Sequence, residues 1–373
     1  MKRDQMKGVR RVVVKVGTST LTYDTGLLNL SRIEGLVRQL ADVHNQGLEL
    51  ILVSSGAIGA GMGKLNLSKR PKTIPEKQAA AAVGQGVLLH MYQKFFSEYG
   101  KTIGQILLTK DDFANRSRYL TARDAFFQLL RQGVVPIVNE NDAIVVDEIK
   151  VGDNDTLSAL VASLVEADLL VILSDIDGLY TANPSTDPGA VKLSIIEEIT
   201  LDIRTMASGA GSALGTGGMA TKIKAAEIAT AAGVHMVIAN GASPRVIQTV
   251  VAGEEEGSLF VKQSKMRARH HWISYGSKVA GQILVDQGAV HALQANKSLL
   301  PVGMVAVEGR FGAGSTVQVL GPDRREVCVG ISHYGSEELV KLVGAKSDEI
   351  EQRIGYRDYD VIIHVDNMIR RRG

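Results

Sequence analysis

The stretch Arg11-Val-Val-Val-Lys15-Val-Gly17-Thr-Ser19 joins a short β-branched run to a polar turn that contains glycine. Similar short runs alternate with longer amphipathic segments as far as Ala252, which predicts a doubly wound α/β domain. Strands are predicted at Arg11 to Val16, Glu49 to Val53, Ile103 to Leu108, Val134 to Val138, Leu169 to Leu173 and His235 to Ala239. Helices are predicted at Pro75 to Tyr99, Ser117 to Gln132, Asp155 to Glu166 and Met219 to Ala232, with another that begins at the capping pattern Ser31 and Glu34.

The pattern changes after residue 262. Residues 263 to 280 contain Lys265, Arg267, Arg269 and Lys278 and no acidic residue, which is typical of a solvated linker. We therefore expect one domain over residues 1–262, a linker over 263–279 and a second domain over 280–373. Strands predicted at Gly281 to Val285, Val302 to Val307, Thr316 to Leu320, Glu326 to Ile331 and Asp360 to Val365, with one helix near Ser336 to Val343, indicate a small β-rich domain or barrel.

Length and composition set further limits. A chain of 373 residues has room for two or three domains, and its single cysteine, Cys328, excludes an internal disulfide framework and fits a reducing compartment. The apolar stretch from Leu157 to Leu173 is interrupted by Glu166 and Asp168 and is too short to cross a membrane. The N-terminus lacks the apolar core of a signal peptide. These features predict a soluble, cytoplasmic protein without a membrane partner.

Ligands of open α/β sheets bind at the carboxyl ends of the strands, so the segments that follow each predicted strand are the candidates for a site. They are Lys15 to Ser19, Ser54 to Gly59, Asn139 to Asp142 and Ser174 to Gly178, and we expect all of them to be loops. Two of these segments are glycine-rich, and glycine loops with unobstructed N–H groups near helix starts suit a polyphosphate.

The familiar phosphate-binding motifs do not fit this sequence. The segment from Gly56 to Lys64 resembles a Walker A loop, but Ile58 stands where that motif needs glycine and Leu65 follows the lysine. Gly59, Gly61 and Gly63 are spaced G-x-G-x-G, so the dinucleotide fingerprint fails as well. A P-loop enzyme and a dehydrogenase both lose support.

A third glycine-rich segment, Gly215 to Lys222, precedes a predicted helix and supplies a second lysine beside glycines. Phosphoryl transfer without a Walker loop needs fixed cations of this kind, usually with Mg²⁺, although a lysine near such a loop is often only a solvated surface residue. Asp153, Asn154 and Asp155 lie at a predicted helix start, where capping is their ordinary use. One buried aspartate among them could instead hold Lys15 and Lys222 in position.

Taken together, these segments resemble the amino acid kinase family. The resemblance rests on Val14 to Ser19, Val53 to Ala57, Ile137 to Ala143, Ile149 to Asp155, Asp175 to Pro184 and Gly215 to Lys222. The NEND and KVGDND sequences within it are similar to those of the branch that phosphorylates glutamate. Residues from about Lys278 to Gly355 resemble the PUA domain that follows the kinase domain in many bacterial members. The resemblance implies a three-layer α/β/α sandwich followed by a small PUA-like barrel.

The family pattern assigns a role to each matching residue. It implies that Lys15 and Lys222 stabilise the transferring phosphoryl group while Asp155 organises the two lysines. It assigns glutamate binding to Ser55, Asp142 and Asn154, of which Asp142 suits the α-ammonium group and the other two can donate to a carboxylate. It assigns nucleotide binding to Lys15, Gly17, Gly56, Ser174, Asp175, Thr216, Gly217, Gly218, Met219, Ala220, Thr221 and Lys222. No metal ligand is expected among the side chains.

The activity implied is ATP-dependent phosphorylation of the γ-carboxylate of L-glutamate to L-glutamyl 5-phosphate, the first step of proline biosynthesis, with ATP and Mg²⁺ as cofactors. It also implies a homo-oligomer, feedback inhibition by proline and handover of the labile product to a glutamyl phosphate reductase. A related kinase for aspartate, N-acetylglutamate, carbamate or UMP remains an alternative. RNA binding through the second domain is another, but residues 281–373 carry 11 basic and 12 acidic side chains, without the excess of positive charge that phosphate contacts need.

Overall fold

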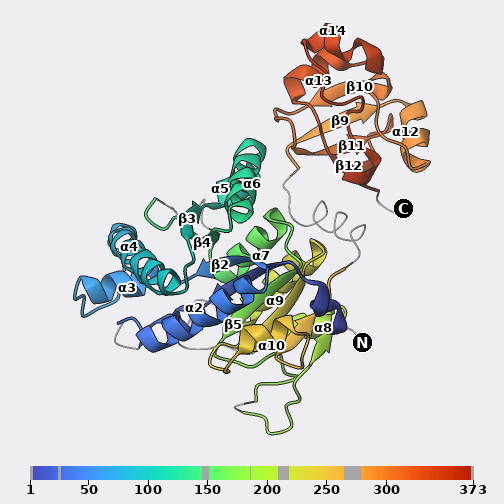
Figure 1. The fold of residues 1–373 in the computed structure, drawn as a ribbon. Helices are drawn as coiled ribbons and strands as arrows, with labels where there is room; N and C mark the ends of the chain where they lie inside the picture. Colours follow the sequence, from blue (N-terminus) through green and yellow to red (C-terminus); the bar gives the residue numbers. More distant parts are fainter. Residues whose placement is uncertain are drawn as a thin grey trace. The chain divides into compact units, whose positions relative to one another are not determined.

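The computed structural model describes residues 3–23, 27–144, 151–184, 186–208, 218–263 and 279–370. The chain divides into two compact units, Met1–Gln263 and Ser264–Gly373 (Figure 1). Each unit has a sheet and a hydrophobic core of its own. The expected linker lies outside the described residues except at its two ends. Within the described ranges, no helix combines the length and the apolar character needed to cross a membrane.

The first unit is built on one sheet of eight strands. Their order across the sheet is β3 (Ile103–Leu108), β4 (Val135–Glu140), β2 (Glu49–Ser54), β1 (Arg11–Val16), β5 (Leu169–Ser174), β7 (His235–Asn240), β8 (Ser258–Phe260) and β6 (Ile195–Ile196). Neighbouring strands are parallel except for the antiparallel pair β7 and β8. All six strands predicted in this unit are present. Because β1, β2, β4 and β5 lie side by side and parallel, their carboxyl ends meet at one edge.

Helices cover both faces of this sheet. They are α1 (Thr18–Leu21), α2 (Leu30–Asn45), α3 (Ala57–Lys64), α4 (Ile74–Glu98), α5 (Lys110–Ala114), α6 (Arg116–Arg131), α7 (Asn154–Leu164), α8 (Leu201–Ser208), α9 (Met219–Ala231) and α10 (Val246–Val251). One core cluster joins the sheet to α2, α4 and α10, and a second cluster joins it to α6, α7 and α9. This arrangement confirms the expected three-layer α/β/α sandwich.

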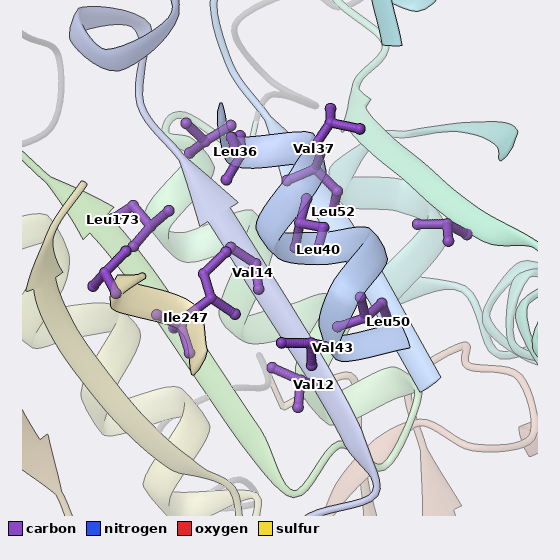
Figure 2. Packing of buried hydrophobic residues seen from close by; sticks show 14 of the residues in the cluster. Val12, Val14, Leu36, Val37, Leu40, Val43, Leu50, Leu52, Leu173 and Ile247 are labelled. Carbon is purple, nitrogen blue, oxygen red and sulfur yellow. The ribbon is translucent and has the colours of Figure 1, made fainter. Parts of the chain in front are cut away.

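The alternation along β1 decides which side chains reach which layer. Val12 and Val14 point into the first cluster, where they meet α2 (Figure 2). Val13 belongs to the second cluster, on the face covered by α7 and α9. Because successive side chains of a strand point to opposite faces, Lys15 lies on the same face as Val13. The lysine in the opening stretch is therefore directed toward α7 and α9.

Several local expectations for the first unit were wrong. Helix α2 is capped by Asn29, whose side chain accepts a hydrogen bond from Arg32 N at 3.2 Å, and not by Ser31. The loop expected from Lys15 to Ser19 runs into α1 at Thr18. The loop expected from Ser54 to Gly59 likewise runs into α3, which residues 57–64 form. Glycine usually weakens a helix, but here it permits close packing against α4. A Cβ built on Gly61 would lie 1.8 Å from the Ala80 carbonyl oxygen, and one on Gly84 would lie 1.7 Å from that of Ala57.

The second unit is β-rich, as expected. Its sheet has the order β10 (Met304–Glu308), β9 (Gly281–Val285), β11 (Thr316–Leu320), β12 (Glu326–Ile331) and β13 (Met368–Arg370), and its helices are α12 (Gln287–Gln294), α13 (Ser336–Leu342) and α14 (Ile350–Ile354). Cys328 is buried in its core. The strand predicted at Asp360 to Val365 was wrong. Ile363 forms only an isolated bridge with Leu299, and the last strand begins at Met368.

We predict that Gly84→Ala lowers the free energy of unfolding by about 3 kcal/mol or more, because α3 and α4 must separate to admit the added methyl group. Urea denaturation followed by circular dichroism measures this change. Gly86 lies on the exposed face of the same helix, with nothing within 4 Å of a built Cβ. Gly86→Ala should therefore be neutral or stabilising by up to about 1 kcal/mol. Equal effects of the two substitutions would contradict packing through Gly84.

Candidate active site

Two glycines begin the site at the carboxyl edge of the sheet. Gly17 follows β1 and Gly56 follows β2, and the pairing of these strands places Val16 beside Ser54. Gly56 has φ +93°, a left-handed conformation that favours glycine, and it precedes the first turn of α3. At Gly17 a built Cβ would lie 3.6 Å from Lys15 Nζ, so the missing side chain leaves the space beside this ammonium group open.

The centre of the site is one aspartate between two lysines. Asp155, in the first turn of α7, forms an ion pair with Lys15 Nζ at 2.7 Å and another with Lys222 Nζ at 3.3 Å. The hydroxyl group of Thr221 also donates to Asp155 Oδ2, at 2.8 Å. Strand β1 and helices α7 and α9 each supply one of the three charged groups. The residues that the sequence predicted to act together are therefore in direct contact.

All three charged side chains of this group are buried, which is unusual for charged groups. The side chains of Lys15, Asp155 and Lys222 are only 9%, 1% and 5% exposed. Burial alone would raise the pKa of Asp155, but the charges of the two lysines and the hydrogen bonds from Lys15 and Thr221 outweigh it and hold this pKa below its ordinary value. The three side chains together carry a net charge of +1. A buried positive charge of this kind is suited to an anionic ligand.

Asp153 caps a helix, which is the ordinary role that the sequence analysis kept open for this segment. Its carboxylate accepts hydrogen bonds from Thr156 N at 2.7 Å and from the Thr156 hydroxyl group at 2.9 Å, so it caps α7. Capping fixes the start of the helix and with it the position of Asp155, two residues later. The two aspartates of the KVGDND sequence thus have different roles.

Asn154 organises the polar group beside the aspartate. Its Nδ2 atom donates toward Ser54 O at 3.0 Å, Ser55 Oγ at 2.9 Å and Asn139 Oδ1 at 2.9 Å. The two hydrogens of this amide are therefore used inside the protein, and its Oδ1 is the atom left to meet a ligand. This differs from the expectation that Asn154 donates to a carboxylate. Ser55 accepts from Asn154, so its own hydrogen can be donated elsewhere.

The end of β4 supplies the neighbouring wall. Asn139 and Glu140 are buried and belong to the strand, although the sequence predicted a loop there, and Asp142 follows in a half-buried turn. Glu140 accepts a hydrogen bond from Val151 N, which ties the start of the KVGDND segment to β4. The functional interpretation of the sequence gave no role to Asn139 or Glu140. Both residues belong to the NEND sequence, which was the signal in the sequence that could have pointed to them. Their hydrogen bonds show that Asn139 holds Asn154 and that Glu140 holds Val151.

The other predicted nucleotide residues end or follow β5, on the side of β1 opposite to β2, or precede or begin α9. Ser174 is the buried last residue of β5, and its hydroxyl group donates to the exposed Asp175 at 2.9 Å. Gly218 precedes α9, which begins with Met219, Ala220, Thr221 and Lys222. Thr216 and Gly217 lie outside the described residues. Since β5 neighbours β1, this side adjoins the paired lysines.

No cluster of three or more His, Cys, Asp or Glu side chains forms a metal-binding group in the ranges that the structure describes. The described side chains of the site would therefore suit a divalent cation whose oxygen ligands come mostly from a bound molecule. A triphosphate is such a molecule.

Comparisons with known proteins match both units of the chain. The model of the amino acid kinase family matches residues 10–240, and the PUA domain model matches residues 281–354. A glutamate 5-kinase of Moorella thermoacetica is 54% identical over 96% of both chains. One of Carboxydothermus hydrogenoformans is 51% identical over 98% of this chain and 99% of its own.

Solved structures share the fold at much lower identity. A carbamate kinase from Giardia lamblia bound to AMP-PNP has a TM-score of 0.50 and 18% identity, and it covers 69% of this chain and 100% of its own. At such identity the likeness concerns the fold alone. The family model and the near full-length relatives establish more, and the chain belongs to the amino acid kinase family.

Proposed function

We propose that this protein catalyses ATP-dependent phosphorylation of the γ-carboxylate of L-glutamate to L-glutamyl 5-phosphate, the first step of proline biosynthesis, in the cytoplasm. The observation that carries the proposal is the buried Lys15–Asp155–Lys222 group at the carboxyl edge of the sheet. The relatives named glutamate 5-kinase, which align over nearly the whole chain, support the choice of substrate.

The residues present suit a reaction that needs no general base. A γ-carboxylate is already ionised at neutral pH, so it can attack the terminal phosphorus of ATP directly. The main obstacle is repulsion between the carboxylate and the triphosphate. Lys15 and Lys222, held by Asp155, place two fixed positive charges where the transferring group would pass, and fixed charges in a buried site cost no reorganisation during the reaction. The backbone at Gly17 and Gly56 would add N–H donors.

Glutamate would bind between β2 and β4. Ser55 is polarised by the hydrogen bond from Asn154, so its hydroxyl hydrogen would be donated to a substrate carboxylate. Asn154 Oδ1 and the carboxylate of Asp142 are acceptors and would receive the α-ammonium group. This division of acceptors and donors fits a free amino acid better than an N-acylated one, because acylation removes the positive charge.

ATP would bind along β5 and the start of α9. Ser174, Asp175 and the residues from Thr216 to Lys222 are its proposed contacts, with the phosphates directed toward Lys15. Mg²⁺ would enter on the phosphate oxygens and offset their negative charge. We further propose a homo-oligomer, inhibition by proline and transfer of the labile acyl phosphate to a glutamyl phosphate reductase. For the PUA-like unit we favour a supporting or regulatory role, and the near-neutral charge of residues 281–373 argues against RNA.

The choice of acceptor can be tested by trapping the acyl phosphate with hydroxylamine. With MgATP, hydroxamate should form with L-glutamate, and it should stay near the buffer level with L-aspartate and N-acetyl-L-glutamate. Carbamate and UMP are tested by ADP release. Activity with another acceptor and none with glutamate would reject the proposed substrate.

We predict that Lys222→Ala lowers kcat by about 10²- to 10³-fold and changes the KM for glutamate much less, because this cation acts mainly on charge in the transition state. Steady-state kinetics measure both constants, and the melting temperature shows whether the variant is folded. Lys224→Ala is the matched control, since Lys224 is exposed two residues along the same helix. A loss confined to glutamate affinity would contradict the role given to Lys222.

A further inference from the structure

The segment that follows β5 is fastened to the distant strand β8. The N–H group of Leu179 donates a hydrogen bond to Ser258 Oγ at 2.8 Å. Ser258 is fully buried and Leu179 nearly so, which means that water cannot replace this bond. Leu179 lies four residues after Asp175, in the loop that we assign to ATP. The serine hydroxyl group therefore fixes the far end of the proposed nucleotide loop.

Glycine at position 178 makes this contact possible. Gly178 has φ +151°, and a Cβ built on it would lie 2.5 Å from Ser258 Oγ. The loop backbone thus passes so close to the serine that position 178 has no room for a side chain. The contact is an element of the fold and not a chance approach of two surface groups.

The same loop is held at two further points. At its start, the Ser174 carbonyl accepts a hydrogen bond from Gly241 N at 2.8 Å. In its middle, Asp177 accepts from the Tyr180 hydroxyl group at 2.9 Å and pairs with Lys192 Nζ at 3.3 Å. Asp175 lies between these fixed points, so its place depends on them.

Strand β8 is itself held by the N-terminal segment. The guanidinium group of Arg3 donates to four backbone carbonyls: Gly257 and Glu256 at 2.8 Å, Glu254 at 3.0 Å and Ser194 at 3.1 Å. Gly257 directly precedes Ser258. A planar guanidinium group can satisfy several carbonyls at once, which a lysine cannot do in the same geometry. Arg3 thus secures the turn from which Ser258 reaches the loop.

We propose that Ser258 is a positioning residue for ATP, acting through Leu179 N, and that Arg3 supports it by fixing the start of β8. This inference rests on the proposed function. It concerns nucleotide affinity alone, because neither residue belongs to the lysine group or to the proposed glutamate contacts. Loss of the serine hydroxyl group leaves a buried N–H without its acceptor, and the loop must move to satisfy it.

The test is Ser258→Ala in the full-length protein. The KM for MgATP should rise about five- to tenfold, while the KM for glutamate and kcat at saturating ATP change less than twofold. The dissociation constant of ATP, measured by calorimetry without glutamate, should rise by a similar factor. Ser332→Ala is the matched control, because Ser332 is an equally buried serine that donates to Tyr334 O at 2.8 Å in the second unit. It should leave both KM values, kcat and the dissociation constant of ATP unchanged.

Arg3→Ala provides a second variant, because the half-buried Arg3 lies at the surface and its loss is less apt to prevent folding. It should raise the KM for MgATP about two- to threefold in the same selective way. An unchanged KM for MgATP in folded Ser258→Ala would overturn the inference, as would an unchanged value in Arg3→Ala if Ser258→Ala does not fold. Failure of the parent protein to phosphorylate glutamate would instead reject the proposed function.

Discussion

The carboxylate of Asp155 is the group on which the rest of the site depends. Two buried ammonium groups would repel each other and lose their hydration, and a single anion between them offsets much of that cost. The three charges come from β1, α7 and α9, so the contact also fixes how these elements pack. The remaining positive charge is useful because the proposed ligands are anionic. An uncharged residue at this position would leave two unmatched cations inside the protein.

The layered fold explains how such a group can be assembled. Strand alternation sends Lys15 to the face that α7 and α9 cover, and Asp153 caps α7 so that Asp155 is held in its first turn. On the opposite side, α4 is held against α3 at Gly84, and α3 begins directly after Gly56. The positions of the proposed catalytic groups therefore depend on packing well outside the site.

Much of this was predictable from the sequence, and the exceptions share a physical cause. The β-branched runs predicted every strand that crosses the centre of the sheet, because such runs are buried on both faces. Helix α3 was missed because its glycines imitate a loop, and only the nearby backbone of α4 explains them. The end of β4 was placed two residues too early because Asn139 and Glu140 are polar, although both are buried and hydrogen-bonded. The roles of Ser258 and Arg3 rest on contacts between residues far apart in sequence, which no local pattern reveals.

The glycines between Gly56 and Lys64 also explain why this segment does not match the familiar phosphate-binding motifs. In a P-loop, successive glycines expose N–H groups to the phosphates. Here only Gly56 stands at the helix start with a left-handed backbone, whereas Gly61 faces Ala80 of α4 and serves packing. In the proposed site, the positive charge that a Walker lysine would supply comes from Lys15 and Lys222, which are far apart in the sequence. Since one aspartate pairs with both, the proposed site would bind a triphosphate without a Walker loop, and the glycines of α3 serve instead to bring two helices together.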